Sequence, residues 1–367
     1  MLEKNVELTG KRILVTGAAG FIGSNLVMEL LKTVDNVEII GIDNMNDYYD
    51  VSLKEFRLKK IEELSDTVTG SFTFIKGNIA DKGTMTGLFN GYRPQIVVNL
   101  AAQAGVRYSI ENPDAYIESN LIGFYNILEA CRHSYDSKDI DYAGVEHLVY
   151  ASSSSVYGSN KKIPYSTEDK VDNPVSLYAA TKKSDELLAH AYSKLYGIPS
   201  TGLRFFTVYG PAGRPDMAYF GFTNKLVRNE TIKIFNYGNC KRDFTYIDDI
   251  VTGVKAVMQC SPLPNSDGVK YKVYNIGNNQ PENLLDFVEI LQDELKAAKV
   301  LPEDYDFESH KELVGMQPGD VEITYADVTE LEKDFEFKPS TSLRDGLRAF
   351  AQWYYEFYVS AAGRNDK

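Results

Sequence analysis

Cysteine and histidine are scarce in this chain, which has three of the former and four of the latter among 367 residues. They are Cys131, Cys240, Cys260, His133, His147, His190 and His310. The cysteines show no paired spacing, which predicts reduced thiols and a cytoplasmic protein rather than a disulfide framework. The histidines lack the spacing of metal ligands, so we expect no metal site.

Long apolar runs and an excess of positive charge are also absent. No stretch approaches the roughly 20 apolar residues of a membrane span, and no apolar run precedes the first strand pattern, so neither a membrane partner nor a signal peptide is expected. The formal net charge of −13 argues against nucleic-acid partners. Any anionic ligand must therefore be held by local cations and N–H groups.

The first half instead alternates short apolar strand patterns with helical ones. The strand patterns are "KRILVTG", "NVEIIGIDN", "SFTFIKGNI", "QIVVNLAA" and "VEHLVYASS". Such alternation predicts an α/β fold, a parallel sheet with helices on both faces. After about residue 205 the pattern is less regular, which predicts a smaller domain over the sheet edge. We expect one domain over 9–205 with about 240–275, and another over about 206–239 and 276–358.

"TGAAGFIG" places Gly17, Gly20 and Gly23 between the first strand and the first helix. Glycines there permit a tight turn and let a pyrophosphate approach the helix N-terminus. Asp43 ends the next strand, at the distance expected of an acid that binds the adenosine ribose. No basic residue follows it directly, so the pattern favours NAD over NADP. The alternative is a tight turn without a ligand.

"SLYAATKK" places Tyr178 and Lys182 four residues apart in a helical pattern. The spacing fits an ordinary surface helix, since i,i+4 neighbours are common. It also fits a proton-transfer pair, because a nearby positive charge favours the phenolate. Spacing alone does not choose between these readings.

Further motifs occur in order: "NLAAQAGV", "SSSSVYG", the Tyr178–Lys182 pair and "RDFTYIDDI". With the glycine triplet they resemble the extended short-chain dehydrogenase/reductase family, among its NAD-dependent sugar-nucleotide epimerases. Within it, "DNMNDYYDVSLK", "LRFFTVYGPAGRPDMAYF" and "MQPGDV" are most similar to the UDP-glucuronate 4-epimerases.

The resemblance implies a Rossmann-type doubly wound sheet that binds NAD, and a smaller C-terminal α/β domain that binds a UDP-sugar. It implies that Tyr178 is the general base, assisted by Lys182 and Ser153, which also bonds the substrate, in C4 inversion through a 4-keto sugar. The implied cofactor-binding residues are Gly17, Gly20, Phe21, Ile22, Gly23, Asp43, Asn78, Ile79, Ala101, Ala102, Tyr178 and Lys182. Asn78 departs from the commoner Asp expected to bind the adenine amine.

Ser154 and Ser155 stand where related dehydratases carry an Asp–Glu pair and related decarboxylases a Glu. Water elimination needs that extra acid, and epimerisation does not. By resemblance, both serines, Thr207 and Arg214 contact the C6 carboxylate of a uronate, for which an Arg fork is suited. The alternative for Arg214 is a structural salt bridge.

By the same resemblance Arg242 binds the diphosphate and Asp320 the nucleotide ribose, while Gln317 replaces a commoner Arg. A homodimer is expected through helices near 114–132 and 176–196, although the first would be equally apolar if covered within one subunit. Three other functions remain open at this point: a 4-epimerase of UDP-glucose or UDP-N-acetylglucosamine-type sugars, a UDP-glucuronate decarboxylase, and a non-catalytic NAD-binding sensor.

Overall fold

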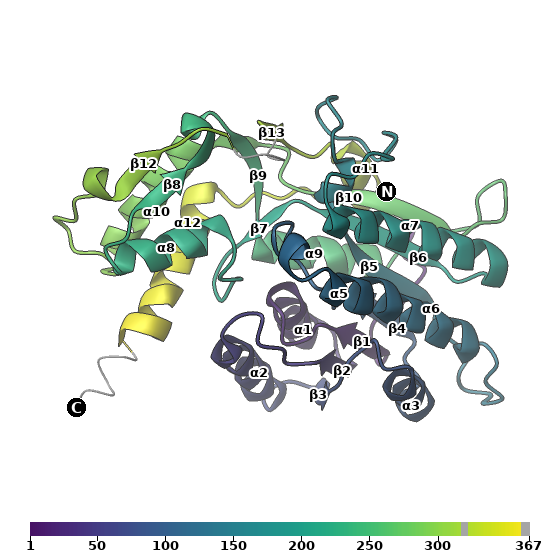
Figure 1. Cartoon of the computed structure of the whole chain (residues 1–367). Helices are drawn as coiled ribbons and strands as arrows, with labels where there is room; N and C mark the ends of the chain where they lie inside the picture. Colours follow the sequence, from purple (N-terminus) through teal and green to yellow (C-terminus); the bar gives the residue numbers. More distant parts are fainter. Residues whose placement is uncertain (317–321, 361–367) are drawn as a thin grey trace.

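The computed structural model describes residues 1–316 and 322–360, and its centre is a sheet of seven parallel strands (Figure 1). Their order is β10-β6-β5-β4-β1-β2-β3. The strands are β1 (Arg12–Thr16), β2 (Glu38–Asp43), β3 (Ser71–Lys76), β4 (Ile96–Asn99), β5 (His147–Ser153), β6 (Ser200–Phe205) and β10 (Tyr271–Ile276). The predicted parallel Rossmann-type sheet is confirmed. Its order reverses between β1 and β4, where this fold class binds ligands.

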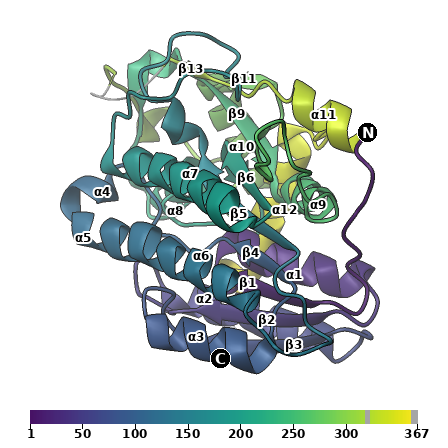
Figure 2. The same ribbon diagram turned by 90° about the vertical axis from the view of Figure 1, so that its right-hand side faces the viewer.

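Helices cover both faces because successive strand residues point to opposite sides. Val15 joins a core cluster with α1 (Phe21–Thr33) and α9 (Ile247–Met258). Leu14 joins another that contains residues of α3 (Lys82–Tyr92), α6 (Gly123–Ser134) and α7 (Leu177–Tyr196). Figure 2 shows α6 and α7 side by side on that face. Short α4 (Tyr108–Glu111) and α5 (Pro113–Tyr116) lead through η1 (Ile117–Ile122) into α6.

A smaller part lies over one end of the sheet, at the left of Figure 1. Its strands are β7 (Thr207–Tyr209), β9 (Lys241–Tyr246), β11 (Pro281–Asn283) and β13 (Ile323–Thr324) in one sheet, and β8 (Ile232–Ile234) and β12 (Lys311–Leu313) in another. Its larger helices are α8 (Ala218–Val227), α10 (Leu284–Ala297) and α12 (Leu343–Tyr354). An aromatic core holds it together: Phe244 stacks on Phe287 at a centroid distance of 4.6 Å.

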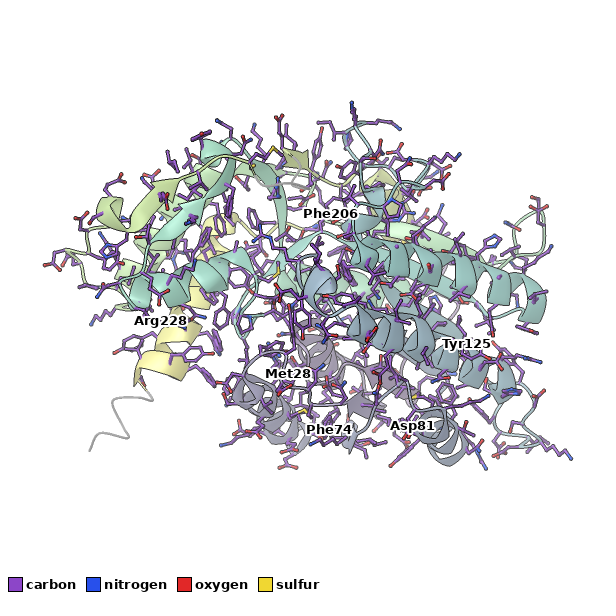
Figure 3. All side chains as sticks on the ribbon, in the orientation of Figure 1. Met28, Phe74, Asp81, Tyr125, Phe206 and Arg228 are labelled. Atoms are coloured by element: carbon purple, nitrogen blue, oxygen red, sulfur yellow. The ribbon has the colours of Figure 1, made fainter. Side chains whose placement is uncertain are left out.

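The chain passes between the two parts more than once. Phe206, labelled in Figure 3, links β6 of the main sheet to β7 of the smaller one. After β9 the chain returns through α9 to β10, which pairs with β6. We propose the two-domain division expected from the sequence, with the return beginning at α9, because β9 pairs with β7, β11 and β13.

The remaining elements are α2 (Val51–Ser65), α11 (Thr329–Phe335) and the short helices η2 (Ser154–Tyr157), η3 (Phe235–Gly238), η4 (Glu308–His310) and η5 (Tyr355–Val359). Leu53 of α2 belongs to the core cluster of the smaller part. Ile61 of the same helix belongs to the core cluster of the main sheet, so helix α2 contributes to both parts of the molecule. Among the described helices, none is long and apolar enough to cross a bilayer.

Candidate active site

The glycine triplet forms a turn that is closely packed by backbone atoms. Gly17 has a φ of +70°, and a Cβ there would lie 2.9 Å from the Ala101 nitrogen. A Cβ on Gly23 would lie 2.1 Å from the Gly17 oxygen. Helix α1 begins after Gly20 without a side-chain cap and without an acidic residue in its first turn. Its positive end is therefore available to an anion, which fits the diphosphate of a dinucleotide.

Asp43 lies at the end of β2, as predicted, and is 8% exposed. Its carboxylate accepts a hydrogen bond from the Met45 N–H at 2.9 Å. The buried ammonium of Lys54, from α2, lies 3.5 Å from the same carboxylate oxygen. Lys54 also donates to the Asn46 side-chain oxygen at 2.9 Å. No basic residue directly follows Asp43 in the sequence, and Lys54, which reaches Asp43 from the next helix, was not predicted.

Asn78 and its neighbours lie beyond β3. The Asn78 amide nitrogen donates to Glu118 at 3.0 Å, and its carbonyl oxygen accepts from the Ala80 N–H at 3.0 Å. That oxygen retains a second lone pair for a ligand donor. Ile79 is buried, and the Ala101 N–H donates to the Thr16 hydroxyl at 3.1 Å. The cofactor contacts of Asn78, Ile79, Ala101 and Ala102 remain predictions.

Tyr178 and Lys182 lie one turn apart in α7, whose start is capped by Ser176, which accepts from the Ala179 N–H at 3.1 Å. Lys182 is 2% exposed, so its side chain is not the solvated lysine of an ordinary surface helix. Its ammonium donates to the Ala151 carbonyl of β5 at 3.0 Å. This bond fixes the cation at the carboxyl end of the central strands, where its charge favours a nearby phenolate.

Asp185 is a buried acid beside Lys182 that the sequence analysis missed. Its Oδ2 lies 3.2 Å from the Lys182 ammonium, and its Oδ1 has no partner among the described residues. Burial raises the pKa of Asp185 to about 7, Lys182 opposes the rise and Glu186 adds to it. The Lys182 charge therefore has a neighbour whose own ionisation changes near neutral pH.

The serines form the turn from β5 into η2, which packs against α7. The Ser153 hydroxyl accepts from the Ser155 N–H at 3.1 Å and donates to the Ser155 hydroxyl at 3.1 Å. Ser152 points elsewhere, toward Glu186 at 2.7 Å. Residues 153–155 thus offer hydroxyls, with no carboxylate of their own, next to the helix that carries the Tyr–Lys pair.

A row of tyrosine rings leads to Tyr178. The Tyr116 ring lies edge-on to it at 6.0 Å, and Tyr108 stands between Tyr116 and Tyr48. Burial and the Asp216 charge raise the pKa of Tyr48 to about 12, and burial raises the pKa of Tyr116 further. These two phenols stay protonated near neutral pH and serve as donors: Tyr48 to Asp216 at 3.3 Å, Tyr116 to the Ala104 carbonyl at 2.9 Å.

Arg214 lies close enough to this group for its charge to act on the pKa of Tyr48 and of Tyr116. Its guanidinium forms two hydrogen bonds with the Asp216 carboxylate, one of them at 3.0 Å from Nε. The salt bridge that the sequence left open is therefore present.

The other predicted substrate residues lie in the smaller part. Thr207 begins β7, half-buried, and Arg242 lies in β9, where its Nη1 donates to the Lys241 and Glu322 carbonyls at 3.0 and 3.2 Å. Asp320 and Gln317 lie outside the described residues. The substrate contacts of these residues remain predictions.

A Rossmann-type sheet with a glycine-rich turn and a helix that carries a Tyr–Lys pair with a buried Lys defines an extended short-chain dehydrogenase/reductase. Within that class, the family model described as GDP-mannose 4,6 dehydratase matches residues 14–350, and the chain belongs to this family. The chain is 49% identical to Protein CapI of Staphylococcus aureus, over 95% of this chain and 99% of that protein.

Two further relatives carry more explicit names. UDP-glucuronate 4-epimerase 4 of Arabidopsis thaliana is 44% identical, over 95% of this chain and 76% of that protein. Among solved structures, UDP-glucuronic acid 4-epimerase from Bacillus cereus, in complex with UDP-glucuronic acid and NAD, matches with a TM-score of 0.77 and 32% identity. The match covers 95% of this chain and all of that one. The resemblance stated from the sequence is confirmed.

Proposed function

We propose that this chain is an NAD-dependent UDP-glucuronate 4-epimerase, which interconverts UDP-glucuronate and UDP-galacturonate. Relatives of that name match nearly the whole chain. The observation that carries the proposal is the turn at residues 153–155, which places hydroxyls against the helix of Tyr178 and Lys182. That constellation suits inversion and lacks the additional acid of a dehydratase or decarboxylase.

Tyr178 takes the proton from the sugar O4 as C4 is oxidised, and returns it when C4 is reduced from the opposite face. Lys182 favours the phenolate that accepts this proton. Ser153 donates a hydrogen bond to the same oxygen and orients it. NAD, when bound, supplies the hydride acceptor and then the donor, so net redox is zero and the proton count is unchanged.

The dinucleotide is held, on this proposal, by the glycine turn, the start of α1 and Asp43, together with residues 78–79 and 101–102. The C6 carboxylate of the sugar is held by Arg214, Thr207, Ser154 and Ser155. The nucleotide part of the substrate is held by Arg242 and Asp320. Asp216 occupies the Arg214 fork in the structure and exchanges with the substrate carboxylate. This clamp also slows loss of CO2 from the 4-keto intermediate, a β-keto acid.

A homodimer and a cytoplasmic location complete the proposal. The layer formed by η1, α6 and α7 leaves several large apolar side chains 38–69% exposed. They are Ile117, Ile122, Tyr125, Leu187, Leu195 and Tyr196. Tyr125, labelled in Figure 3, stands on the outer side of α6. The location is supported by the three cysteines, which are buried and unpaired.

Purified protein incubated with UDP-glucuronate, with products resolved by chromatography, tests the function. UDP-galacturonate is the expected product, and Tyr178→Phe should lower kcat by about 10²–10⁴-fold. Tyr196→Phe, at the far end of the same helix, is the control and should stay active. UDP-xylose as the product would indicate a decarboxylase. Turnover confined to UDP-glucose or UDP-N-acetylglucosamine would indicate a neutral-sugar epimerase, and no turnover a binding protein.

A further inference from the structure

Arg57 is a buried cation without an anionic partner. It lies in α2, is 1% exposed, and uses all five of its N–H donors on uncharged oxygens. Nε and Nη2 donate to the Ala212 carbonyl at 2.9 and 2.7 Å, and Nη2 also donates to the Gly213 carbonyl at 2.9 Å. Nη1 donates to the Ala19 carbonyl at 3.0 Å and to the Tyr49 hydroxyl at 2.7 Å. Among the described residues, no ion pair includes Arg57.

These bonds join the two turns on which the proposed function depends. Ala19 lies between Gly17 and Gly20, in the turn assigned to the cofactor diphosphate. Ala212 and Gly213 directly precede Arg214. Ala212 has a left-handed φ of +50°, a conformation that is energetically costly for a residue with a side chain. The two hydrogen bonds from Arg57 to the Ala212 carbonyl hold this conformation in place.

The charge of Arg57 calls for a counter-charge. Burying a guanidinium without an anion is costly, and carbonyl dipoles compensate the cost only in part. The glycine turn itself contains no Lys or Arg, and the whole chain carries a net charge of −13. A dianionic diphosphate bound at this turn would supply the missing negative charge close to the Arg57 guanidinium, which donates to the Ala19 carbonyl.

We propose that Arg57 is a positioning residue for both ligand sites: its charge supports the cofactor diphosphate, and its fork sets the turn that carries Arg214. The inference rests on the proposed function for the substrate side. Its cofactor side stands on the glycine turn alone, so the two can fail separately.

Two substitutions separate charge from hydrogen-bond geometry. Arg57→Lys keeps the charge but cannot bridge both turns, so we expect the NAD Kd within about threefold of the parent and KM for UDP-glucuronate raised about tenfold, with kcat changed less. Arg57→Met loses both, so the NAD Kd should also rise about tenfold. Lys60→Met, on the exposed face of the same helix, is the control.

Calorimetric titration of the cofactor-free protein with NAD gives the first readout and does not depend on turnover. Steady-state kinetics gives the second, and circular dichroism checks that each variant folds. If UDP-glucuronate is not a substrate, a lower NAD affinity for Arg57→Met still supports the cofactor side. If the NAD Kd and the KM for UDP-glucuronate of both folded variants lie within twofold of the values for Lys60→Met, the proposal is overturned. Failure of both variants to fold would also overturn it, in favour of a purely structural role.

Discussion

Asp185 shows how a single buried residue makes stability depend on pH. Its pKa in the folded protein, about 7, is above the ordinary value of 3.8, so folding favours the protonated form. The stabilisation is complete below about pH 4 and is lost as pH rises through 7. Asp185→Asn removes this dependence. Between pH 4 and 8, the free energy of unfolding of the variant should rise relative to that of the parent by about 4 kcal/mol at most. Denaturant unfolding at several pH values measures it, and parallel pH curves would contradict it.

The same substitution bears on catalysis, because Asp185 faces Lys182 at 3.2 Å. Without the carboxylate, the ammonium acts more strongly on the Tyr178 phenolate. The kcat of Asp185→Asn should therefore differ from that of the parent above pH 7, where the parent carries the carboxylate, and match it at lower pH, where Asp185 is protonated. Equal kcat values over the whole range would show that the pair is purely structural.

Lys54 gives a second prediction at this scale, on cofactor choice. It lies 3.5 Å from Asp43 and offsets the charge that repels a 2′-phosphate. Lys54→Met should therefore raise the ratio of the NADP Kd to the NAD Kd several-fold, about 1 kcal/mol in discrimination. Calorimetric titration with each cofactor measures the ratio. Lys59→Met, an exposed residue of the same helix, should leave the ratio unchanged. A ratio that falls in Lys54→Met would contradict the prediction.

The residue scale is also where sequence reasoning reached its limit. The pairs Lys54–Asp43 and Arg214–Asp216 and the contacts of Arg57 depend on how helix α2 and the turn before α8 pack. Periodicity and spacing describe neighbours along one element, and they do not carry that information. Tyr178, Lys182 and the glycine triplet were found because they lie in short motifs whose order along the chain carries the resemblance to the family.

At the scale of elements, Asp243 of β9 connects the loop that follows β10 with the loop that follows β13 through hydrogen bonds. Its Oδ1 accepts from the Asn278 N–H at 2.7 Å, and its Oδ2 accepts from the Asn279 and Ala326 N–H groups at 3.0 Å each. All three partners are donors, so an amide nitrogen in place of either oxygen would face an N–H group. Asp243→Asn should cost about 2 kcal/mol of unfolding free energy.

Chemical denaturation compares this variant with Asp304→Asn, whose side chain is exposed and which should match the parent. Equal stability of the two variants would contradict the role of Asp243.

The helices and strands of the first half of the chain were predicted well from the sequence. Apolar strands and capped helices there follow local patterns, whereas the short strands β7, β11 and β13 are defined by their partners.

At the scale of the whole molecule, the exposed apolar layer of η1, α6 and α7 sets the expected assembly. Leu187 is 61% exposed on α7. A glutamate there would be buried without a partner in a dimer, so Leu187→Glu should shift the protein from dimer to monomer. Light scattering after size-exclusion chromatography measures the mass. Leu263→Glu, at a leucine that is 75% exposed and lies outside these helices, should remain dimeric. A monomeric parent would contradict the prediction.

The return of the chain to the main sheet through β10 has a consequence for how such proteins change their substrates. Because β10 covers the outer edge of β6, a fragment ending at residue 205 would leave that edge open to aggregation. The smaller part is thus built from two segments, one between β6 and β10 and one after β10. Exchanging everything after residue 205 by simple recombination would also remove a strand from the sheet that holds the cofactor, so new specificity is expected to arise by altering loops within these two segments.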